Sequence, residues 1–545
     1  MNASKLRETI LVVILLALGV MVRIAAVEEW SYDLKPLPDA MEYSLVANQL
    51  ASLSAPVLTI DGHPYPSRYP LGTPLMLTPF ALLFGGRLPW LFVGVLLYAT
   101  LVLLLTYLFA RQILTPAGAA IALAITALSP EHTRFSVLVM SEIPSGLLLL
   151  AIAFSWMRMG RERLHPVGTL LIGVVAGFAT IVRYPNGLVL ICLLVDVVRR
   201  IKTSEAGATR GLVLLLLGSA LPVAGQLFAN QLLFGSALEN GYRYWEPNDY
   251  ATGRAILLRH ALVPDQSVWQ NGGFSYYGKA LLGLHPALYR PEVFALALLG
   301  TAVVWRSRHQ RRQLILLALL PIVTFAFYCC YFFQAYRMLV PVLPFLAVLA
   351  AVPIDRLTSW RPGRLVGIGM PIVVVAALSL RMASPLREVL RKASDERPYA
   401  SLPAFESLRG QLDRDAVIVW DLPLALGSRL LPGFELMPLT ADGVDRHLAW
   451  IIQHDLAPID GWRGRPVPLY LDRTILHPPS YERLQHLSQQ GRRILFIHAH
   501  RGAATEMKDV IARYFTAKRY VHEGTEFFAN GLWVLELVPR SGRGS

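Results

Sequence analysis

The chain has 545 residues, of which 54% are hydrophobic and 16% charged, and its mean hydropathy is +0.46. This composition is too apolar for a water-soluble fold of that length. The formal net charge of +14 would favour nucleic-acid binding in a soluble chain, but here most Lys and Arg residues stand in short clusters between apolar runs. Such clusters orient a membrane protein, so no nucleic-acid partner is expected.

Apolar runs recur along the first 385 residues. A helix needs about 20 apolar residues to cross about 30 Å of hydrocarbon. The sequence therefore predicts an α-helical polytopic membrane protein with about eleven transmembrane helices. The predicted spans are 10–27, 88–110, 117–128, 143–157, 167–181, 188–198, 212–228, 293–305, 314–333, 339–352 and 365–380.

The loop charges predict the orientation. With the N-terminus in the cytoplasm, every inside connection is basic, as at Arg199-Arg200 and Arg311-Arg312, whereas the outside connections are longer and contain acids. An odd number of spans places the C-terminus outside the plasma (inner) membrane. Run 10–27 also fits a secretory signal, but it is longer than the usual apolar region of one, which favours an uncleaved anchor. Arg23, near its outer end, is expected to snorkel to the interface.

Residues 386–545 have a mixed polar and apolar composition. Strand-like runs (416–420, 467–471 and 493–498) alternate with helix-like stretches (402–412, 444–453 and 481–489), which predicts a small soluble α/β domain outside the membrane. Asn530-Gly531 between two apolar runs predicts a β-hairpin. No catalytic motif is found here, so this domain is expected to cover the membrane part or to grip an acceptor.

The first external loop, residues 28–87, concentrates acidic and aromatic residues. Asp39 is a candidate general base, because a carboxylate can deprotonate a hydroxyl during group transfer. The alternative is a capping box, in which Asp39 caps a helix and Glu42 occupies the third position. Further on, Pro74 and Pro79 interrupt an apolar stretch, which we interpret as an interfacial segment.

Two more acidic candidates follow. Glu131 and His132 lie in Ser129-Pro130-Glu131-His132, and Glu142 opens the predicted span 143–157. A carboxylate that enters an apolar helix is costly, so Glu142 is a functional candidate. The alternative is an acid at a helix N-terminus, where the helix dipole favours it.

Arg183 and Arg337 both fall on the predicted external side, against the positive-inside trend. An arginine there can bind phosphate through two parallel hydrogen bonds. The alternative is snorkelling to lipid headgroups. Apolar residues surround Arg337, which favours phosphate binding for it.

In their order along the chain, several of these features resemble the multispanning glycosyltransferases of the GT-C class. The similarity is greatest to bacterial relatives of protein mannosyltransferases and lipid A aminoarabinose transferases, and it covers about residues 8–385 of the predicted membrane domain, 1–385. The features are Asp39-x-x-x-Tyr43-x-x-x-Ala47, Arg68-Tyr69-Pro70-Leu71, Ser129-Pro130 before Ser141-Glu142-x-Pro144, the span end from Gly177 to Arg183, Asn230 to Tyr242 with Phe234-Gly235-Ser236 in the external loop 230–291, and Arg337 with Pro341 and Pro344.

The resemblance implies an inverting transfer of a sugar from a polyprenyl-phosphate donor to a lipid, glycan or protein acceptor on the extracytoplasmic side. It implies that Asp39 is the catalytic base, that Glu142 orients acceptor or donor, and that Arg337 and Arg183 hold the leaving phosphate. The other implied substrate-binding residues are Glu42, Tyr43, Arg68, Tyr69, Glu131, His132 and Tyr336. Many relatives have an adjacent acidic pair in the first loop, but here Ala40 follows Asp39 and Glu42 is the nearest substitute.

Some members of this class use a divalent metal. Asp39, Glu42, Glu131, His132 and Glu142 could supply ligands, but no compact spacing demands a metal, and no other cofactor is indicated. The alternative functions are a transporter or flippase of a lipid-linked glycan, for which we find no repeated halves, and a non-catalytic assembly factor. The enzyme hypothesis requires a carboxylate near residue 39 and a guanidinium near residue 337 to converge on one cavity at the outer leaflet.

Overall fold

The computed structural model divides the chain into two compact units. The helical unit comprises Met1–Glu28, Pro70–Asn240 and Thr252–Lys392, and the second unit comprises Glu29–Tyr69, Gly241–Ala251 and Ala393–Ser545. The residues that the structure describes are 3–30, 38–60, 63–84, 88–159, 164–245, 256–262, 272–282, 284, 291–306, 315–360, 373, 376–377, 381, 383, 386–387, 415–420, 435–438, 485–498, 515–519, 521–522, 525–526, 528–529 and 532–539.

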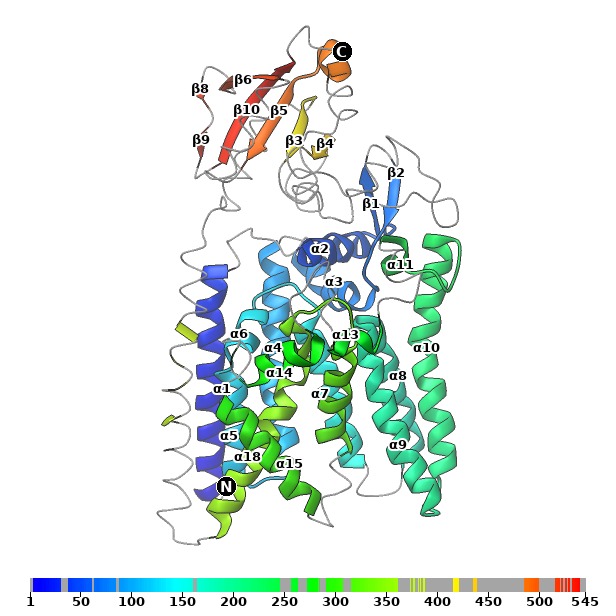
Figure 1. The fold of residues 1–545 in the computed structure, drawn as a ribbon, viewed down its shortest axis with the longest axis vertical. Coiled ribbons are helices and arrows are strands. Elements are labelled where there is room, and N and C mark those ends of the chain that lie inside the picture. The colour runs from blue at the N-terminus through cyan, green and yellow to red at the C-terminus, as the bar shows by residue number, and fades with distance from the viewer. Residues whose placement is uncertain are drawn as a thin grey trace. The chain divides into compact units, whose positions relative to one another are not determined.

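The helical unit consists of helices that run mostly side by side (Figure 1). Its elements are α1 (Ala3–Trp30), α3 (Gly72–Phe84), α4 (Leu88–Ala110), α5 (Pro116–Ala127), α6 (Pro130–Phe135), α7 (Glu142–Met159), α8 (Pro166–Val182), η1 (Tyr184–Gly187), α9 (Leu188–Lys202), α10 (Ala208–Phe234), α13 (Arg259–Leu262), α14 (Gly273–Leu281), α15 (Pro291–Arg306), the π-helical turn η2 (Ile315–Leu319), α17 (Leu320–Cys329), the 3₁₀ turn η3 (Tyr336–Val342) and α18 (Leu343–Trp360).

The apolar helices make the protein an integral membrane protein. In the described part of the chain, five segments are long and apolar enough to cross a bilayer: Glu8–Ala26, Leu91–Ala110, Glu142–Met159, Ala208–Phe234 and Tyr336–Leu357. The shorter apolar helices are Gly72–Phe84, Pro116–Ala127, Pro166–Val182 and Leu316–Cys329. The predicted spans 10–27, 88–110, 143–157 and 212–228 fall in α1, α4, α7 and α10. Most of the predicted span 365–380 lies outside the described residues, and the count of eleven stays a prediction.

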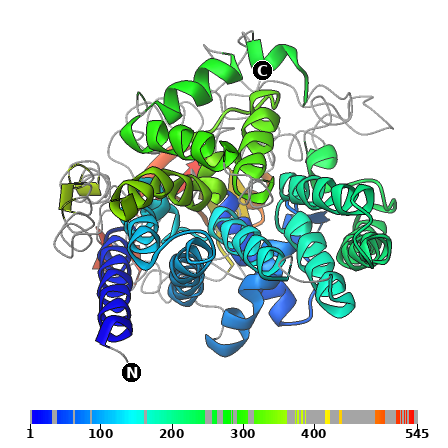
Figure 2. The same ribbon diagram turned by 90° about the horizontal axis from the view of Figure 1, so that it is seen from below.

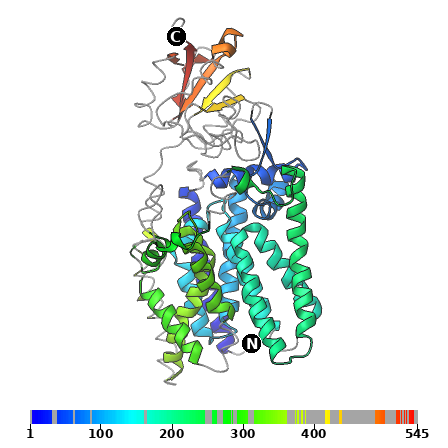
Figure 3. The same ribbon diagram turned by 45° about the vertical axis from the view of Figure 1, so that its right-hand side comes forward.

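Helices α8 and α10 pack along a seam of small residues, and Figure 3 shows them side by side. A Cβ on Gly173 would lie 2.4 Å from the carbonyl oxygen of Leu215, and one on Gly177 would lie 2.2 Å from that of Ser219. Glycine is required at both positions, because small residues let two membrane helices bring their backbones into contact.

Arg23 joins α1 to the rest of the helical unit. It is completely buried and donates hydrogen bonds to the carbonyl oxygen of Ala127 (3.0 Å) and to Ser136 Oγ (3.1 Å). The expected snorkelling of Arg23 is therefore wrong. Because α5 ends at Ala127, its last carbonyl groups have no N–H partner within the helix. The Arg23 guanidinium donates hydrogen bonds to these carbonyl groups. In Figures 1 and 2, α1 stands at one edge of the helices and α8, α9 and α10 stand at another.

The start of α3 packs against the end of α8. A Cβ on Gly72 would lie 2.4 Å from the backbone nitrogen of Val182, and Thr73 Oγ1 donates to the carbonyl oxygen of Val182 at 3.2 Å. These contacts fix the backbone directly before Arg183, at the end of α8. Helix α7, which begins at Glu142, packs against η3, which contains Arg337. The end of α8, the start of α7 and η3 therefore bring Arg183, Glu142 and Arg337 together.

The second unit contains α2 (Pro38–Ala51), the hairpin of β1 (Val57–Ile60) and β2 (His63–Pro66), α11 (Gly241–Trp245) and a sheet of C-terminal strands. The sheet order is β4 (Glu435–Pro438), β3 (Val417–Trp420), β5 (Ile494–His498), β10 (Leu532–Pro539) and β6 (Phe515–Arg519). Strand β3 runs parallel to β4 and β5, whereas β10 runs antiparallel to β5 and β6.

Two predictions for the C-terminal part are confirmed. The strands predicted at 416–420 and 493–498 are β3 and β5, and the pairing of Ala529, in β9 (Phe528–Ala529), with Leu532 confirms the hairpin around 530–531. Residues 485–489 are helical, within the predicted stretch 481–489. The runs 402–412, 444–453 and 467–471 lie outside the described residues, so the α/β class of this domain stays a prediction.

Candidate functional site

Asp39 lies in the first turn of α2 and is bound by a tyrosine. The hydroxyl of Tyr69 donates to Asp39 Oδ1 at 2.7 Å. The Tyr69 ring is buried and lies 4.8 Å, between centroids, from the ring of Tyr43 one turn after Asp39. Burial raises the pKa of Tyr69 well above its ordinary value, so the hydroxyl keeps its proton and remains a donor.

Glu42 is held by the segment before Tyr69. Its Oε1 accepts hydrogen bonds from Ser67 Oγ (2.7 Å) and from the backbone N–H of Arg68. Burial raises the pKa of Glu42, and the bonds from Ser67 and Arg68 oppose this shift. The capping-box interpretation is therefore wrong: Asp39 lies inside the helix after Pro38, and Glu42 binds a segment 25 residues away.

Arg68 lies between two aromatic rings. Its guanidinium carbon is 5.3 Å from the ring centroid of Tyr69 and 5.6 Å from that of Tyr242 in α11. These are cation–π distances. The carbonyl oxygen of Arg68 would lie 2.2 Å from a Cβ on Gly241, so only glycine lets α11 approach this closely. Together these residues form an acidic–aromatic cluster: Asp39, Glu42, Tyr43, Arg68, Tyr69 and Tyr242.

The helical unit contains an arginine cluster, formed by Glu142, Arg183 and Arg337. Glu142, the first residue of α7, is 1% exposed, and its Oε1 lies 3.4 Å from Arg183 Nη1 and 3.9 Å from Arg337 Nε. Two guanidinium groups thus share one carboxylate. The other oxygen, Glu142 Oε2, is buried without a hydrogen-bond partner among the described residues.

Neighbouring elements fix the direction of Arg183. It ends α8 in an extended conformation, its guanidinium carbon lies 5.7 Å from the ring centroid of Tyr328, and its Nη2 contacts Met338 Sδ. The side chains of Arg183 and Arg337 are 11% and 18% exposed. The cluster therefore holds an excess of positive charge in a largely buried place, where it suits an anion such as phosphate.

A second group of polar residues surrounds α6. Glu131 is 1% exposed and lies 3.9 Å from Arg134 Nη1, which donates to the hydroxyl of Tyr336 at 2.7 Å. His132 instead faces α1, with Nδ1 2.8 Å from Arg23 Nη2. Burial and then the charge of Arg23 lower the pKa of His132 well below its ordinary value, so a neutral ring can accept this bond.

The sequence-predicted site residues thus fall into separate groups. Five of them gather at α2 in the second unit, and Glu142, Arg183 and Arg337 gather in the helical unit, where Arg134 connects Glu131 to Tyr336. The expected convergence of Asp39 with Arg337 stays a prediction, because the two residues belong to different units. Sequence reasoning missed Arg134, although it is, like Arg183, an arginine in a predicted outside loop, and it named Tyr242 only as the end of a motif and not as a site residue.

Metal ligands were also considered among the candidate residues, because some members of the class use a divalent metal. In the part of the chain that the structure describes, no three His, Cys, Asp or Glu side chains gather as metal ligands would. The oxygens of Asp39 and Glu42 instead accept hydrogen bonds from Tyr69 and Ser67.

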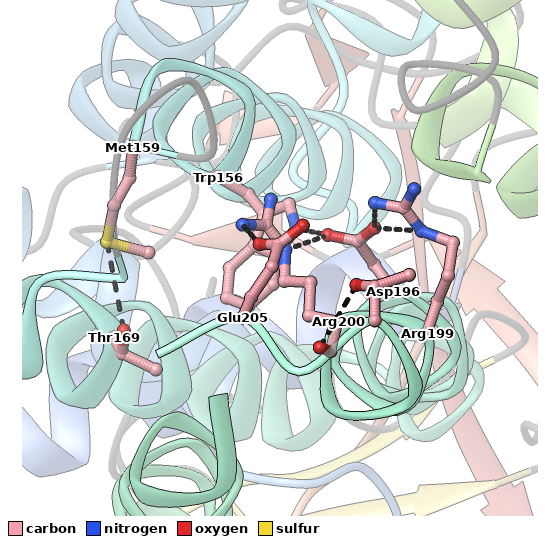
Figure 4. Close-up of polar contacts among 8 residues, drawn as sticks. Trp156, Met159, Thr169, Asp196, Arg199, Arg200 and Glu205 are labelled. Atoms are coloured by element: carbon pink, nitrogen blue, oxygen red, sulfur yellow. Dashed lines mark hydrogen bonds and ion pairs between the residues drawn. The ribbon is translucent and has the colours of Figure 1, made fainter. Parts of the chain in front are cut away.

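Another charged network of the helical unit lies in the second half of α9, around Asp196, Arg199 and Arg200 (Figure 4). Asp196 accepts hydrogen bonds from Arg199 Nη2 (2.7 Å), Arg200 Nε (2.9 Å) and Trp156 Nε1 (3.0 Å). Arg200 also pairs with Glu205 at 3.0 Å. Asp196 lies eight residues, about 12 Å, after the start of α9, and this length of helix separates the network from Arg183. It joins α7, α9 and the turn into α10, so we assign it a structural role.

Comparison with known proteins identifies the fold. A family model described as dolichyl-phosphate-mannose-protein mannosyltransferase matches residues 68–224. No curated protein sequence matches the chain significantly. The solved structure of ArnT from Cupriavidus metallidurans bound to undecaprenyl phosphate is similar, with a TM-score of 0.63 and 13% identity over 96% of this chain and 97% of that chain.

A second solved structure is similar over a longer chain. This is the archaeal oligosaccharyltransferase AglB from Archaeoglobus fulgidus in complex with an inhibitory peptide and a dolichol-phosphate, with a TM-score of 0.53 and 12% identity over 99% of this chain and 77% of that chain. The chain therefore has the fold of the GT-C glycosyltransferases, and the resemblance predicted from the sequence is confirmed at this level.

Proposed function

We propose that the protein is a glycosyltransferase that moves a sugar from a polyprenyl-phosphate donor to an acceptor on the extracytoplasmic side of the membrane. The arginine cluster carries this proposal. Two guanidinium groups with one carboxylate, largely buried among apolar helices, suit a phosphate attached to a lipid. The matched ArnT and AglB structures contain undecaprenyl phosphate and a dolichol-phosphate, which supports a donor of this class.

In the proposed reaction, an acceptor hydroxyl attacks the anomeric carbon and the bond from that carbon to the phosphate oxygen breaks, with inversion. Asp39 takes the proton of the hydroxyl. Arg183 and Arg337 stabilise the negative charge that develops on the leaving phosphate. The Tyr69 hydroxyl orients the Asp39 carboxylate, and Glu142 orients the two arginines and, through Oε2, a hydroxyl of the donor or acceptor.

This mechanism requires Asp39 and the arginine cluster to reach the same donor molecule. The proposed topology has eleven spans, a cytoplasmic N-terminus and an extracytoplasmic α/β domain from residue 386. The short basic connections on the proposed inside support it, since the outside connections are longer and contain acids.

Sugar transfer by the purified protein in liposomes, with a polyprenyl-phosphate sugar as donor, tests the proposal. Asp39→Asn keeps the shape of the side chain but removes the base, so the turnover rate should fall at least about 100-fold. Arg337→Ala should raise the KM for the donor. Asp415→Asn, at an exposed aspartate of the sheet part, is the matched control and should leave the rate unchanged.

Full activity of Asp39→Asn would remove Asp39 from the mechanism. Movement of the intact lipid-linked sugar across the bilayer without any glycosyl product would instead support the alternative, a flippase. Loss of activity that follows loss of folded protein is recognised by comparing thermal stability with the wild type.

A further inference from the structure

The turn that leads into Arg337 is held by two consecutive tyrosines from α14. The hydroxyl of Tyr277 lies 3.2 Å from the backbone nitrogen of Ala335 and 3.3 Å from its carbonyl oxygen, so it accepts one hydrogen bond and donates another. The hydroxyl of Tyr276 accepts a hydrogen bond from the backbone N–H of Tyr336 at 3.2 Å. Both contacts cross about 60 residues of sequence.

These hydroxyl groups replace a missing helix cap. Ala335 is the N-cap of η3 and forms no side-chain cap hydrogen bond, since alanine has no acceptor. The first N–H groups of a helical turn have no partner within it. The tyrosyl oxygens supply these partners directly before Arg337, in a 3₁₀ turn whose own hydrogen bonds are weak.

Helix α14 is itself fixed along the same stretch of chain. A Cβ on Gly273 would lie 2.2 Å from the carbonyl oxygen of Cys329, so glycine lets α14 begin against the end of α17. Upstream, the backbone N–H of Leu257 donates to the carbonyl oxygen of Cys330 at 2.9 Å. The ring of Tyr277 is completely buried beside Tyr328, over which Arg183 lies. The two tyrosines therefore do not adjust freely.

We propose that Tyr276 and Tyr277 are positioning residues for Arg337: they fix the backbone of Ala335 and Tyr336, and thereby set where the Arg337 guanidinium meets the donor phosphate. This inference rests on the proposed function. It predicts that loss of either hydroxyl weakens donor binding through Arg337 and through no other group.

Kinetics of single and combined variants test this dependence. Tyr276→Phe and Tyr277→Phe should each raise the donor KM about three- to tenfold, the effect of one net hydrogen bond, with kcat changed less than twofold. In an Arg337→Lys background the same substitutions should add little, because the group they position is already altered. Equal effects in both backgrounds would show a general structural role and overturn the proposal.

The matched control is Tyr98→Phe, which removes a tyrosyl hydroxyl bound to the carbonyl oxygen of Met76, away from this turn. It should leave the donor KM unchanged. A raised KM in this variant as well would show that loss of any such hydroxyl is enough, which contradicts a role specific to Arg337.

Hydrogen exchange of the substrate-free protein separates this inference from the proposed function. The amides of Ala335 and Tyr336 bind the tyrosyl oxygens, so Tyr277→Phe should speed exchange at Ala335 and Tyr276→Phe at Tyr336. Unchanged protection would overturn the positioning role even if sugar transfer is observed. If exchange becomes faster in the two variants but the wild type transfers no sugar, the positioning contacts are supported and the proposed function is disproved.

Discussion

Glu142, Arg183 and Arg337 show what a charged residue contributes inside an apolar helical unit. A buried carboxylate alone is strongly unfavourable, but next to guanidinium groups much of that cost is recovered. Glu142 also lies at the N-terminus of α7, where the helix dipole favours an acid. The structural and functional readings of Glu142 are therefore compatible: one carboxylate begins a helix and holds two arginines.

At Glu42 the raised pKa predicts a dependence of stability on pH. The folded protein binds the proton of Glu42 more tightly than the unfolded chain, whose value is near 4.5. The stabilising contribution of this residue is therefore complete below pH 4.5 and is lost as the pH rises through the folded-state pKa. Relative to Glu42→Gln, the wild type should lose stability over this range and then level off.

Thermal unfolding in detergent between pH 4.5 and 8 measures this difference. Glu292→Gln, at a half-exposed carboxylate of α15, controls for the loss of one charge. A difference between the wild type and Glu42→Gln that does not change with pH would contradict the burial effect.

Which residues carry charge in unusual places could be predicted from the sequence, but their partners could not. Asp39 was chosen for its acidity in an apolar chain, yet its partner Tyr69 lies 30 residues away. Glu42 and Arg23 were wrongly given local or solvent partners, because sequence spacing shows only the neighbours along one helix. Their true partners come from segments that only the folded chain brings together.

The glycine seam between α8 and α10 makes a prediction about two elements. Gly177→Ala would push a methyl group into the carbonyl oxygen of Ser219 and should destabilise the protein by about 1–3 kcal/mol. Gly225→Ala, in the partner helix α10, meets no atom within 4 Å and is the matched control, with unchanged or slightly raised stability. Thermal unfolding checks both, and equal stability of the two variants would show that the seam can open without cost.

Long apolar runs predict membrane helices directly, whereas short interrupted runs leave more than one interpretation open. Runs 88–110 and 212–228 have only one physical explanation, a membrane helix, and α4 and α10 confirm it. The stretch with Pro74 and Pro79 forms the continuous helix α3, with Pro79 inside it, and its interpretation as an interfacial segment stays a prediction. Pro74 lies in the first turn of α3, where a missing N–H costs nothing. The turns η2 and η3 depend on tertiary packing and had no signal in the sequence.

At the scale of the whole molecule, the orientation in the membrane is the main prediction still to be tested. Helix α10 has 27 residues and is about 40 Å long, so its ends should lie on opposite sides of the bilayer. In a protein with its three cysteines replaced, an impermeant maleimide should label Leu238→Cys on intact cells, but Ala206→Cys only after permeabilisation. The reverse labelling pattern would show that the orientation is opposite to the proposed one.

The fold as a whole is shared with ArnT at 13% identity over nearly the full length of both chains. Few particular residues can be responsible for such a likeness. The apolar segments predict a helical membrane protein, and the resemblance to this fold comes from the ordered motifs, such as Arg68-Tyr69-Pro70-Leu71. The chemistry of the site depends instead on a few side chains, and there sequence spacing alone left the alternatives open.

The buried position of Arg23 has a consequence for biosynthesis. Its partner carbonyl at Ala127 lies 104 residues further along the chain. When α1 leaves the ribosome, the carbonyl oxygen of Gly19, in the same helix, is already present as an acceptor, but those of Thr126 and Ala127 are not, so we expect the remaining N–H groups to stay near the lipid headgroups until α5 is inserted. We therefore expect helix α1 to reach its final depth late in translation. Arg23→Leu should let the helix reach that depth earlier and should leave the end of α5 without this donor.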